Sequence, residues 1–125
     1  MILDTCALIW LATGDTRLSE RAREHIAHSV TVSVSAITAF EIGVKYAKGK
    51  LRLPSAPSIW FETALKLHDV SVCPIDHLTA LRATELPPIH ADPCDRLIIA
   101  TAQLLGQPII TTDTKFTRYE VTTIA

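Results

Sequence analysis

The chain has 125 residues, of which 48% are hydrophobic, and its formal net charge is −1. This length is enough for one domain, residues 1–125, with a buried core, and the apolar, balanced composition excludes a long disordered or low-complexity tail. The near-neutral charge excludes binding of nucleic acid mainly by phosphate neutralisation, so any such binding must depend on a local patch of charge or on a metal ion.

The N-terminal part of the chain alternates between strand and helix patterns. Residues 1–3 form a short apolar run typical of a buried strand, and Asp4 is a suitable N-cap for a helix over residues 5–12 that ends near Gly14. Residues 31–35 alternate β-branched residues with serines, as a strand does. Helices are predicted on either side of this strand, over residues 19–28, capped by Ser19, and over residues 37–48, ending at Gly49.

The C-terminal part continues the alternation after a proline-containing connection over residues 53–57. Helices are predicted over residues 58–67, 76–86 and 93–105, and strands over residues 70–73, 108–111 and 121–124, the last at a sheet edge. Strands that alternate with helices favour right-handed crossovers and a mainly parallel sheet covered on both faces. The predicted fold class is therefore α/β, a three-layer α/β/α sandwich whose sites form beyond the carboxyl ends of the strands.

The cysteines and the N-terminus bear on the compartment. Cys6, Cys73 and Cys94 are far apart and form no C-x-x-C pair, which favours free thiols in a reducing cytosol. The N-terminus lacks the basic region and cleavage site of a secretory signal, and no apolar run reaches the ~20 residues that span a bilayer. We expect a soluble, cytoplasmic protein with no membrane partner.

Two aspartates directly follow predicted strands at the two ends of the chain. Asp4 follows residues 1–3, and Asp113 comes just after residues 108–111. Both should lie at the carboxyl edge of the sheet. Each also has a purely structural interpretation, with Asp4 as a helix N-cap and Asp113 in an Asx-turn.

Glu41 and Asp95 lie on helices that can reach the same edge. Ile37, Phe40 and Val44 form an apolar stripe, and Glu41 borders it, which predicts a carboxylate turned partly toward the core. The structural alternative is an ion pair between Glu41 and Lys45.

Asp95 stands in the first turn of a helix that is apolar almost all round, so this turn should point into the sheet edge. Asp92 and Pro93 suit the N-cap and first helical positions, and a structural role suits Asp92 better than a functional one. Carboxylates about 4 Å apart repel by about 4 kcal/mol at an effective dielectric of 20. A shared site therefore predicts bound cations, and oxygen ligands suit Mg²⁺ or Mn²⁺.

Four short motifs in this order resemble those of PIN-domain ribonucleases, in particular the VapC-type toxins of bacterial toxin–antitoxin modules. They are Leu3-Asp4-Thr5, Phe40-Glu41-Ile42 with Lys45 and Gly49-Lys50-Leu51, Asp92-Pro93-Cys94-Asp95-Arg96, and Thr111-Thr112-Asp113 with Phe116. The resemblance spans nearly the whole chain.

The resemblance implies an Mg²⁺- or Mn²⁺-dependent endoribonuclease that hydrolyses RNA. Asp4, Glu41, Asp95 and Asp113 match the family's metal-binding acidic quartet, with Asp4 and Asp95 as the principal ligands. Thr5 and Thr111 match residues that support these ligands. By analogy, a VapB-like antitoxin covers the site, and the protein forms a homodimer through helices at the sheet edge.

Several residues near these motifs have open roles. Arg96 is expected either to pair with an acid or to contact RNA. Lys45, Lys48, Lys50 and Arg52 either contact phosphates or form a solvated face. Cys94 departs from the aromatic residue usual in the family, and it either packs or acts as a redox-sensitive thiol. His90 is expected to have a surface or structural role, because the histidines show no metal-ligand spacing.

Other classes of protein fit the sequence less well. A haloacid-dehalogenase phosphatase needs a second Asp two residues after the first, where this chain has Cys6. A receiver domain needs an early acidic pair and a late lysine in a different arrangement. A binding module that lacks activity accounts for the fold but not for four acids, and nuclease assays with metal and with EDTA distinguish it from an enzyme.

Overall fold

A computed structural model describes residues 1–125 and contains one parallel sheet. The strand order is β3-β2-β1-β4-β5, and every neighbouring pair is parallel. The strands are β1 (Ile2–Leu3), β2 (Val32–Ser35), β3 (Val70–Cys73), β4 (Ile109–Ile110) and β5 (Thr123–Ile124). The first strand along the chain thus lies at the centre of the sheet, and the last lies at an edge, as predicted.

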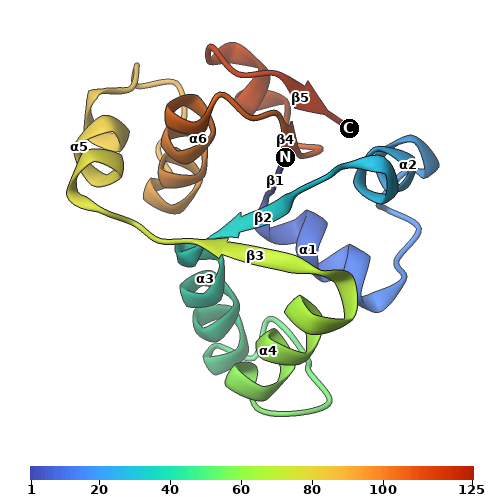
Figure 1. The fold of residues 1–125 in the computed structure, drawn as a ribbon. Helices are drawn as coiled ribbons and strands as arrows, with labels where there is room; N and C mark the ends of the chain where they lie inside the picture. Colours follow the sequence, from blue (N-terminus) through green and yellow to red (C-terminus); the bar gives the residue numbers. More distant parts are fainter.

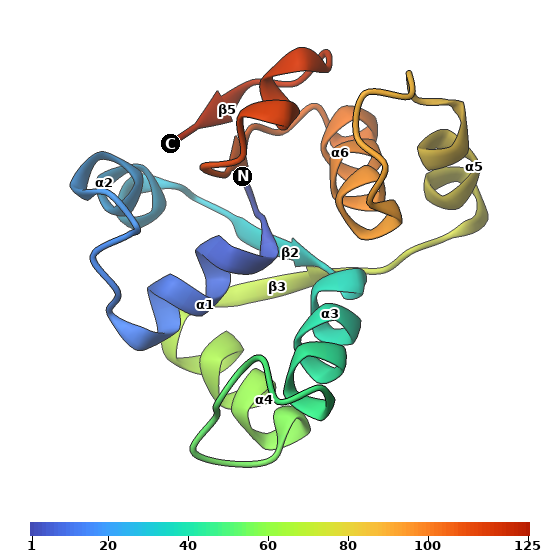
Figure 2. The same ribbon diagram turned by 180° about the vertical axis from the view of Figure 1, so that it is seen from behind.

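Helices connect the strands and cover both faces of the sheet (Figures 1 and 2). They are α1 (Thr5–Thr13), α2 (Glu20–His28), α3 (Ala36–Ala47), α4 (Pro57–His68), α5 (His77–Glu85), α6 (Pro93–Leu105) and the 3₁₀ helix η1 (Thr114–Arg118). The predicted elements agree within one residue, except at the start of β5. The short helix η1 was not predicted, because one turn held by Asp113 has no hydrophobic period.

The two faces of the sheet bury two separate cores. Leu3 packs into a cluster formed with α1 to α4, whereas its neighbour Ile2 packs into a second cluster with α5, α6 and η1. Successive strand residues point to opposite faces, so even a two-residue strand contributes to both cores. The three-layer α/β/α prediction is confirmed. None of the helices has the length and hydropathy of a bilayer-spanning segment.

Arg96 anchors the connection between α5 and α6. Its guanidinium donates to the carbonyl oxygens of Ala83, Leu86, Pro87 and His90 at 2.7–3.3 Å. Some of these carbonyls end α5 and lack a partner within the helix. The expected pairing of Arg96 with an acid is therefore wrong, and the residue instead holds a backbone turn beside the start of α6.

Arg96→Lys should lower the free energy of unfolding by about 2–4 kcal/mol, because one ammonium cannot replace the planar guanidinium and leaves carbonyl oxygens unpaired. Urea unfolding measures this loss. Arg21→Lys, on the exposed face of α2, is the matched control and should change stability by less than about 0.5 kcal/mol. Equal stability of the two variants would show that the carbonyl contacts are dispensable.

Candidate metal centre

The four predicted acids line one pocket of about 220 Å³ at the carboxyl edge of the sheet. Asp4 directly follows β1, and Asp113 follows β4, the neighbouring strand. Glu41 lies on α3, which begins directly after β2, and Asp95 lies in the first turn of α6. Parallel neighbours end at the same edge, which explains why acids far apart in sequence meet here.

Asp4 combines both roles considered from the sequence. Its Oδ1 accepts a hydrogen bond from the Ala7 amide at 2.8 Å and caps α1, and the residue is only 7% exposed. Burial raises the pKa of the Asp4 carboxyl, hydrogen bonds from Thr111 and Ala7 oppose this, and the charges of Glu41 and Asp113 add to the rise. Asp4 also lines the acidic pocket, so the same carboxylate caps α1 and belongs to the candidate site.

Glu41 is oriented by a hydroxyl network. The Thr5 hydroxyl donates to Glu41 Oε1 at 2.7 Å and lies 3.1 Å from the Thr38 hydroxyl. Desolvation raises the pKa of Glu41, the Thr5 hydrogen bond lowers it, and the nearby charge of Asp92 raises it again. Thr5 thus contacts an acid of the pocket, as its family match implied.

The predicted apolar stripe on α3 is wrong at Phe40, although Ile37 packs against a core cluster and the conclusion about Glu41 is right. The stripe comprised Ile37, Phe40 and Val44. Phe40 is 62% exposed, whereas the buried positions of α3 are Thr38 and Ile42. Glu41 lies within one turn of both, and the hydrogen bond from the Thr5 hydroxyl on α1 holds its carboxylate toward the pocket.

Asp95 has a strongly shifted carboxyl. Desolvation, followed by the charges of Asp92, Glu41, Asp4 and Asp113, raises the pKa of Asp95 to about 8. Asp92 caps α6 by accepting from the Cys94 amide at 2.9 Å, as predicted. The N-cap of α6 therefore does not depend on Asp95. Helix capping does not explain why this carboxylate lies close to other negative charges.

Asp113 is held in a tight turn after β4. Its Oδ1 accepts from the Lys115 amide at 2.9 Å and caps η1, and its own amide donates to the Thr111 hydroxyl at 3.0 Å. The predicted Asx-turn is therefore present together with the predicted approach to the other acids. Thr111 thus contacts the backbone of Asp113, and its hydroxyl also lowers the pKa of the Asp4 carboxyl.

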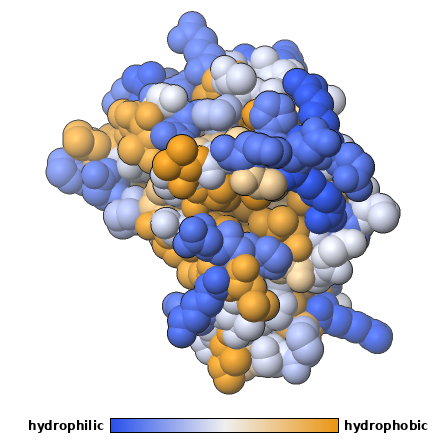
Figure 3. All heavy atoms as spheres, turned by 45° about the vertical axis from the view of Figure 1, so that its right-hand side comes forward, coloured by the Kyte–Doolittle hydropathy of each residue, from blue (hydrophilic) through white to orange (hydrophobic).

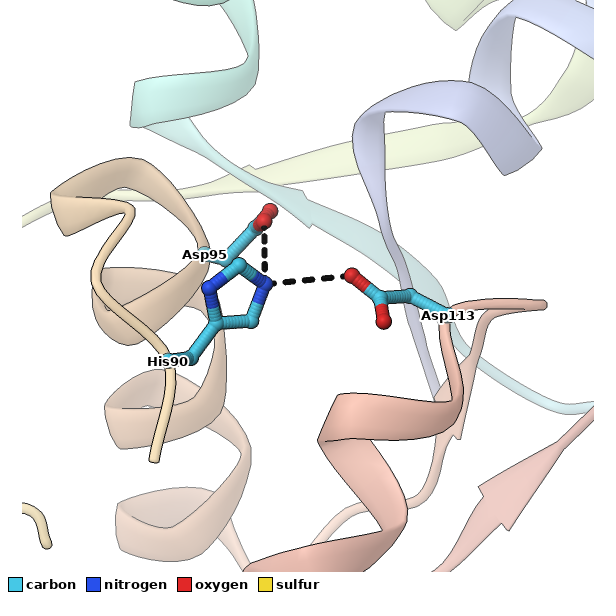
Figure 4. A group of neighbouring side chains, drawn as sticks. All are labelled: His90, Asp95 and Asp113. Atoms are coloured by element: carbon cyan, nitrogen blue, oxygen red, sulfur yellow. Dashed lines mark hydrogen bonds and ion pairs between the residues drawn. The ribbon is translucent and has the colours of Figure 1, made fainter. Parts of the chain in front are cut away.

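His90 lies beside this cluster. The expectation of a surface position is wrong, whereas the alternative of a structural role agrees with its burial and its hydrogen bonds. The residue is 7% exposed, and its Nε2 lies 2.9 Å from Asp95 Oδ2 and 3.1 Å from Asp113 Oδ2 (Figure 4). It precedes α6 in an irregular segment after Pro87-Pro88. No helical or strand spacing relates His90 to Asp95, so the sequence pattern could not predict that the two side chains meet.

The structure distinguishes among the other residues whose roles were open, by whether they line the acidic pocket. Lys45 lines the acidic pocket, whereas Lys48, Lys50 and Arg52 are exposed outside it. Burial raises the pKa of the Cys94 thiol to about 11, with nearby carboxylates adding to the rise. A thiol that stays protonated is a poor nucleophile, which disfavours the redox-sensitive interpretation of Cys94.

The donor atoms of the pocket fit a divalent cation. Two groups of three side chains, His90–Asp95–Asp113 and Glu41–Asp92–Asp95, each bring their ligand atoms within 4.8 Å of one another. Asp95 belongs to both groups. Carboxylate oxygens are the preferred ligands of Mg²⁺ and Mn²⁺, and a cation would offset the burial and the repulsion that raise the pKa values of Asp4, Glu41 and Asp95.

Comparisons with known proteins agree on one family. The sequence profile of the PIN domain matches residues 1–121. The chain is 30% identical over 114 residues to Ribonuclease VapC22 of Mycobacterium tuberculosis (strain ATCC 25618 / H37Rv), a match that covers 90% of this chain and 86% of the relative.

Two solved structures share the fold across nearly the whole chain. VapBC2 from Rickettsia felis, bound to a DNA fragment from its promoter, has a TM-score of 0.70 at 14% identity and covers 98% of this chain and 96% of its own. A toxin–antitoxin complex from Klebsiella pneumoniae has a TM-score of 0.66 at 23% identity and covers 99% and 95%.

Proposed function

The chain belongs to the PIN domain family, and from this premise we propose that it is a metal-dependent endoribonuclease that acts as the toxin of a toxin–antitoxin pair. The observation that carries the proposal is the convergence of Asp4, Glu41, Asp95 and Asp113 on one pocket. The relative named a ribonuclease supports the activity. We further propose that residues 1–125 form a single nuclease domain.

The four acids are proposed as both the metal ligands and the catalytic residues. Asp95 is the central ligand, because its carboxylate lies within 4.8 Å of carboxylate oxygens of Asp113, Glu41 and Asp92. Thr5 orients Glu41, and Thr111 supports Asp4 and Asp113. The bound ion is Mg²⁺ or Mn²⁺, and it would polarise a phosphodiester and make a bound water more acidic.

Basic side chains near the acids would favour the phosphates of an RNA backbone. Lys45 is the one basic side chain that lines the pocket. The exposed Lys48, Lys50 and Arg52 follow on the same segment. Their contribution to binding should be electrostatic and therefore weaker at high salt.

An antitoxin is proposed as the protein partner. Two of the similar structures are toxin–antitoxin assemblies. One face of this chain carries a band of hydrophobic residues bordered by hydrophilic ones (Figure 3), a surface character typical of protein-binding sites. By family analogy, a VapB-like antitoxin would cover the pocket, and the toxin would form a homodimer.

Purified chain, free of antitoxin, should cleave RNA with Mn²⁺ or Mg²⁺ and should lose this activity with EDTA. Asp4→Asn should also abolish cleavage, and because Asn is as good an N-cap as Asp, α1 should stay folded. Asp69→Asn is the matched control. Asp69 precedes β3 at the opposite edge of the sheet, and its left-handed backbone (φ 52°) suits Asn.

The alternative is an RNA-binding module without activity. It would be correct if the metal-loaded protein bound RNA but never cut it, and if Asp4→Asn left this binding unchanged. Sequencing the cleavage ends of total RNA after brief induction identifies the target. Growth arrest relieved by a co-expressed neighbouring gene would establish the toxin role separately from the nuclease activity.

A further inference from the structure

His90 lies between two acids of the pocket that come from different parts of the fold. Asp95 belongs to α6, and Asp113 to the turn after β4. Figure 4 shows the imidazole between them, with Nε2 directed at both carboxylates, at 2.9 Å from Asp95 Oδ2 and 3.1 Å from Asp113 Oδ2. One nitrogen atom therefore bridges the two acids.

The hydrogen-bond partners assign the proton of the neutral ring. The Asp92 amide N–H points at His90 Nδ1 at 3.3 Å, so Nδ1 is an acceptor. A neutral imidazole carries its proton on the other nitrogen, and Nε2–H then donates to the two carboxylates. In this arrangement, Nε2 has no lone pair free for a cation.

The ring is fixed from several sides, as a positioning role requires. The His90 amide donates to the Tyr119 hydroxyl at 2.7 Å, and that hydroxyl donates to the Pro87 carbonyl at 2.8 Å. The ring packs edge-on against Phe116, with centroids 5.8 Å apart and planes at 80°. Arg96 donates to the His90 carbonyl. These contacts tie the imidazole to η1 and α6, the elements that bear or adjoin both acids.

We propose that His90 is a positioning residue that sets the separation of Asp95 and Asp113 for the divalent cation, by donating Nε2–H to both. This inference rests on the proposed metal site. Without the N–H donor, the negative charges of the two carboxylates repel each other and the side chains move apart. A cation must then bring them together again, which weakens its binding. Outer hydrogen-bond partners of metal ligands commonly affect metal affinity by about 10–100-fold.

Titration of the metal-free full chain with Mn²⁺, followed by electron paramagnetic resonance, tests the proposal. His90→Leu and His90→Met, which cannot donate, should weaken Mn²⁺ binding by about tenfold or more. His90→Gln keeps an N–H donor at a similar reach and should bind within about threefold of the wild type. His25→Leu, on the exposed face of α2, is the control and should bind as the wild type does.

The rescue by Gln separates positioning from packing, because a merely structural histidine would not distinguish Gln from Met. Unchanged Mn²⁺ affinity in both donor-free variants would overturn the proposal while leaving the metal site intact. A ¹⁴N coupling from imidazole to Mn²⁺, lost in His90→Leu, would also overturn it and make His90 a direct ligand. If neither the wild type nor any variant binds Mn²⁺, the proposed metal site fails together with this inference.

Discussion

Asp95→Asn should lower RNA cleavage by about a thousandfold and leave the protein folded. The Asp95 carboxylate lies within 4.8 Å of those of Asp113, Glu41 and Asp92, so its neutralisation should weaken the binding of any cation in the pocket. Loss of several kcal/mol of transition-state stabilisation by a metal ion corresponds to a rate loss of about this size. Single-turnover cleavage of a defined RNA measures the effect.

The fold should survive this substitution for two reasons. Asp92, not Asp95, caps α6, and Asn has nearly the same shape as Asp while removing a charge from a crowded site. Asp69→Asn, at the opposite edge of the sheet, should retain full activity. If Asp95→Asn instead unfolds the protein while Asp69→Asn does not, Asp95 has a structural role and the proposed metal centre loses its central ligand.

Metal-free protein should lose stability as the pH rises from about 4 to about 8. Burial and neighbouring charges raise the pKa of Asp95 from 3.8 to about 8, and the pKa values of Asp4 and Glu41 are raised as well. Groups with a raised pKa in the folded state bind more protons folded than unfolded. The stability that these carboxyl groups contribute is fully present below their pKa in the unfolded state. It is lost as the pH rises to their pKa in the folded state.

The expected size is a fall in melting temperature of about 10 °C across this range. Melting curves in EDTA between pH 4 and pH 8 measure it. The lowered pKa values of Asp15 and Asp76 act in the opposite sense, because they stabilise the fold above the ordinary pKa of Asp. Their effect is lost only below about pH 4 and therefore lies outside the range.

Two comparisons connect this pH dependence to the pocket. Asp95→Asn should flatten the curve and melt above the wild type at pH 8 in EDTA, because one repelling charge is gone. Saturating Mn²⁺ at pH 8 should raise the wild-type melting temperature, since a ligand that binds only the folded state stabilises it. Stability that rises with pH in EDTA would show that the acids do not repel one another in the folded protein.

Most of the fold could be predicted from local patterns. Apolar patterns and capping residues predicted every strand and every α-helix of the sandwich, because each element buries one face and is ended by its caps. The prediction failed for η1, where a single turn depends on the Asp113 side chain. It also failed for the buried face of α3, where Thr38 is buried and Phe40 is exposed. A threonine whose hydroxyl is buried against polar partners looks like a surface residue in a pattern based on hydrophobicity.

By itself, the sequence determined which strands end in an acid, and hence that Asp4 and Asp113 share one edge of a parallel sheet. Only the tertiary structure decided the contacts between segments: Thr5 with Glu41, Arg96 with the end of α5, and His90 with Asp95 and Asp113. Helical and strand periods relate residues within one element. A hydrogen bond across elements depends on how those elements pack, and no spacing along the chain encodes it.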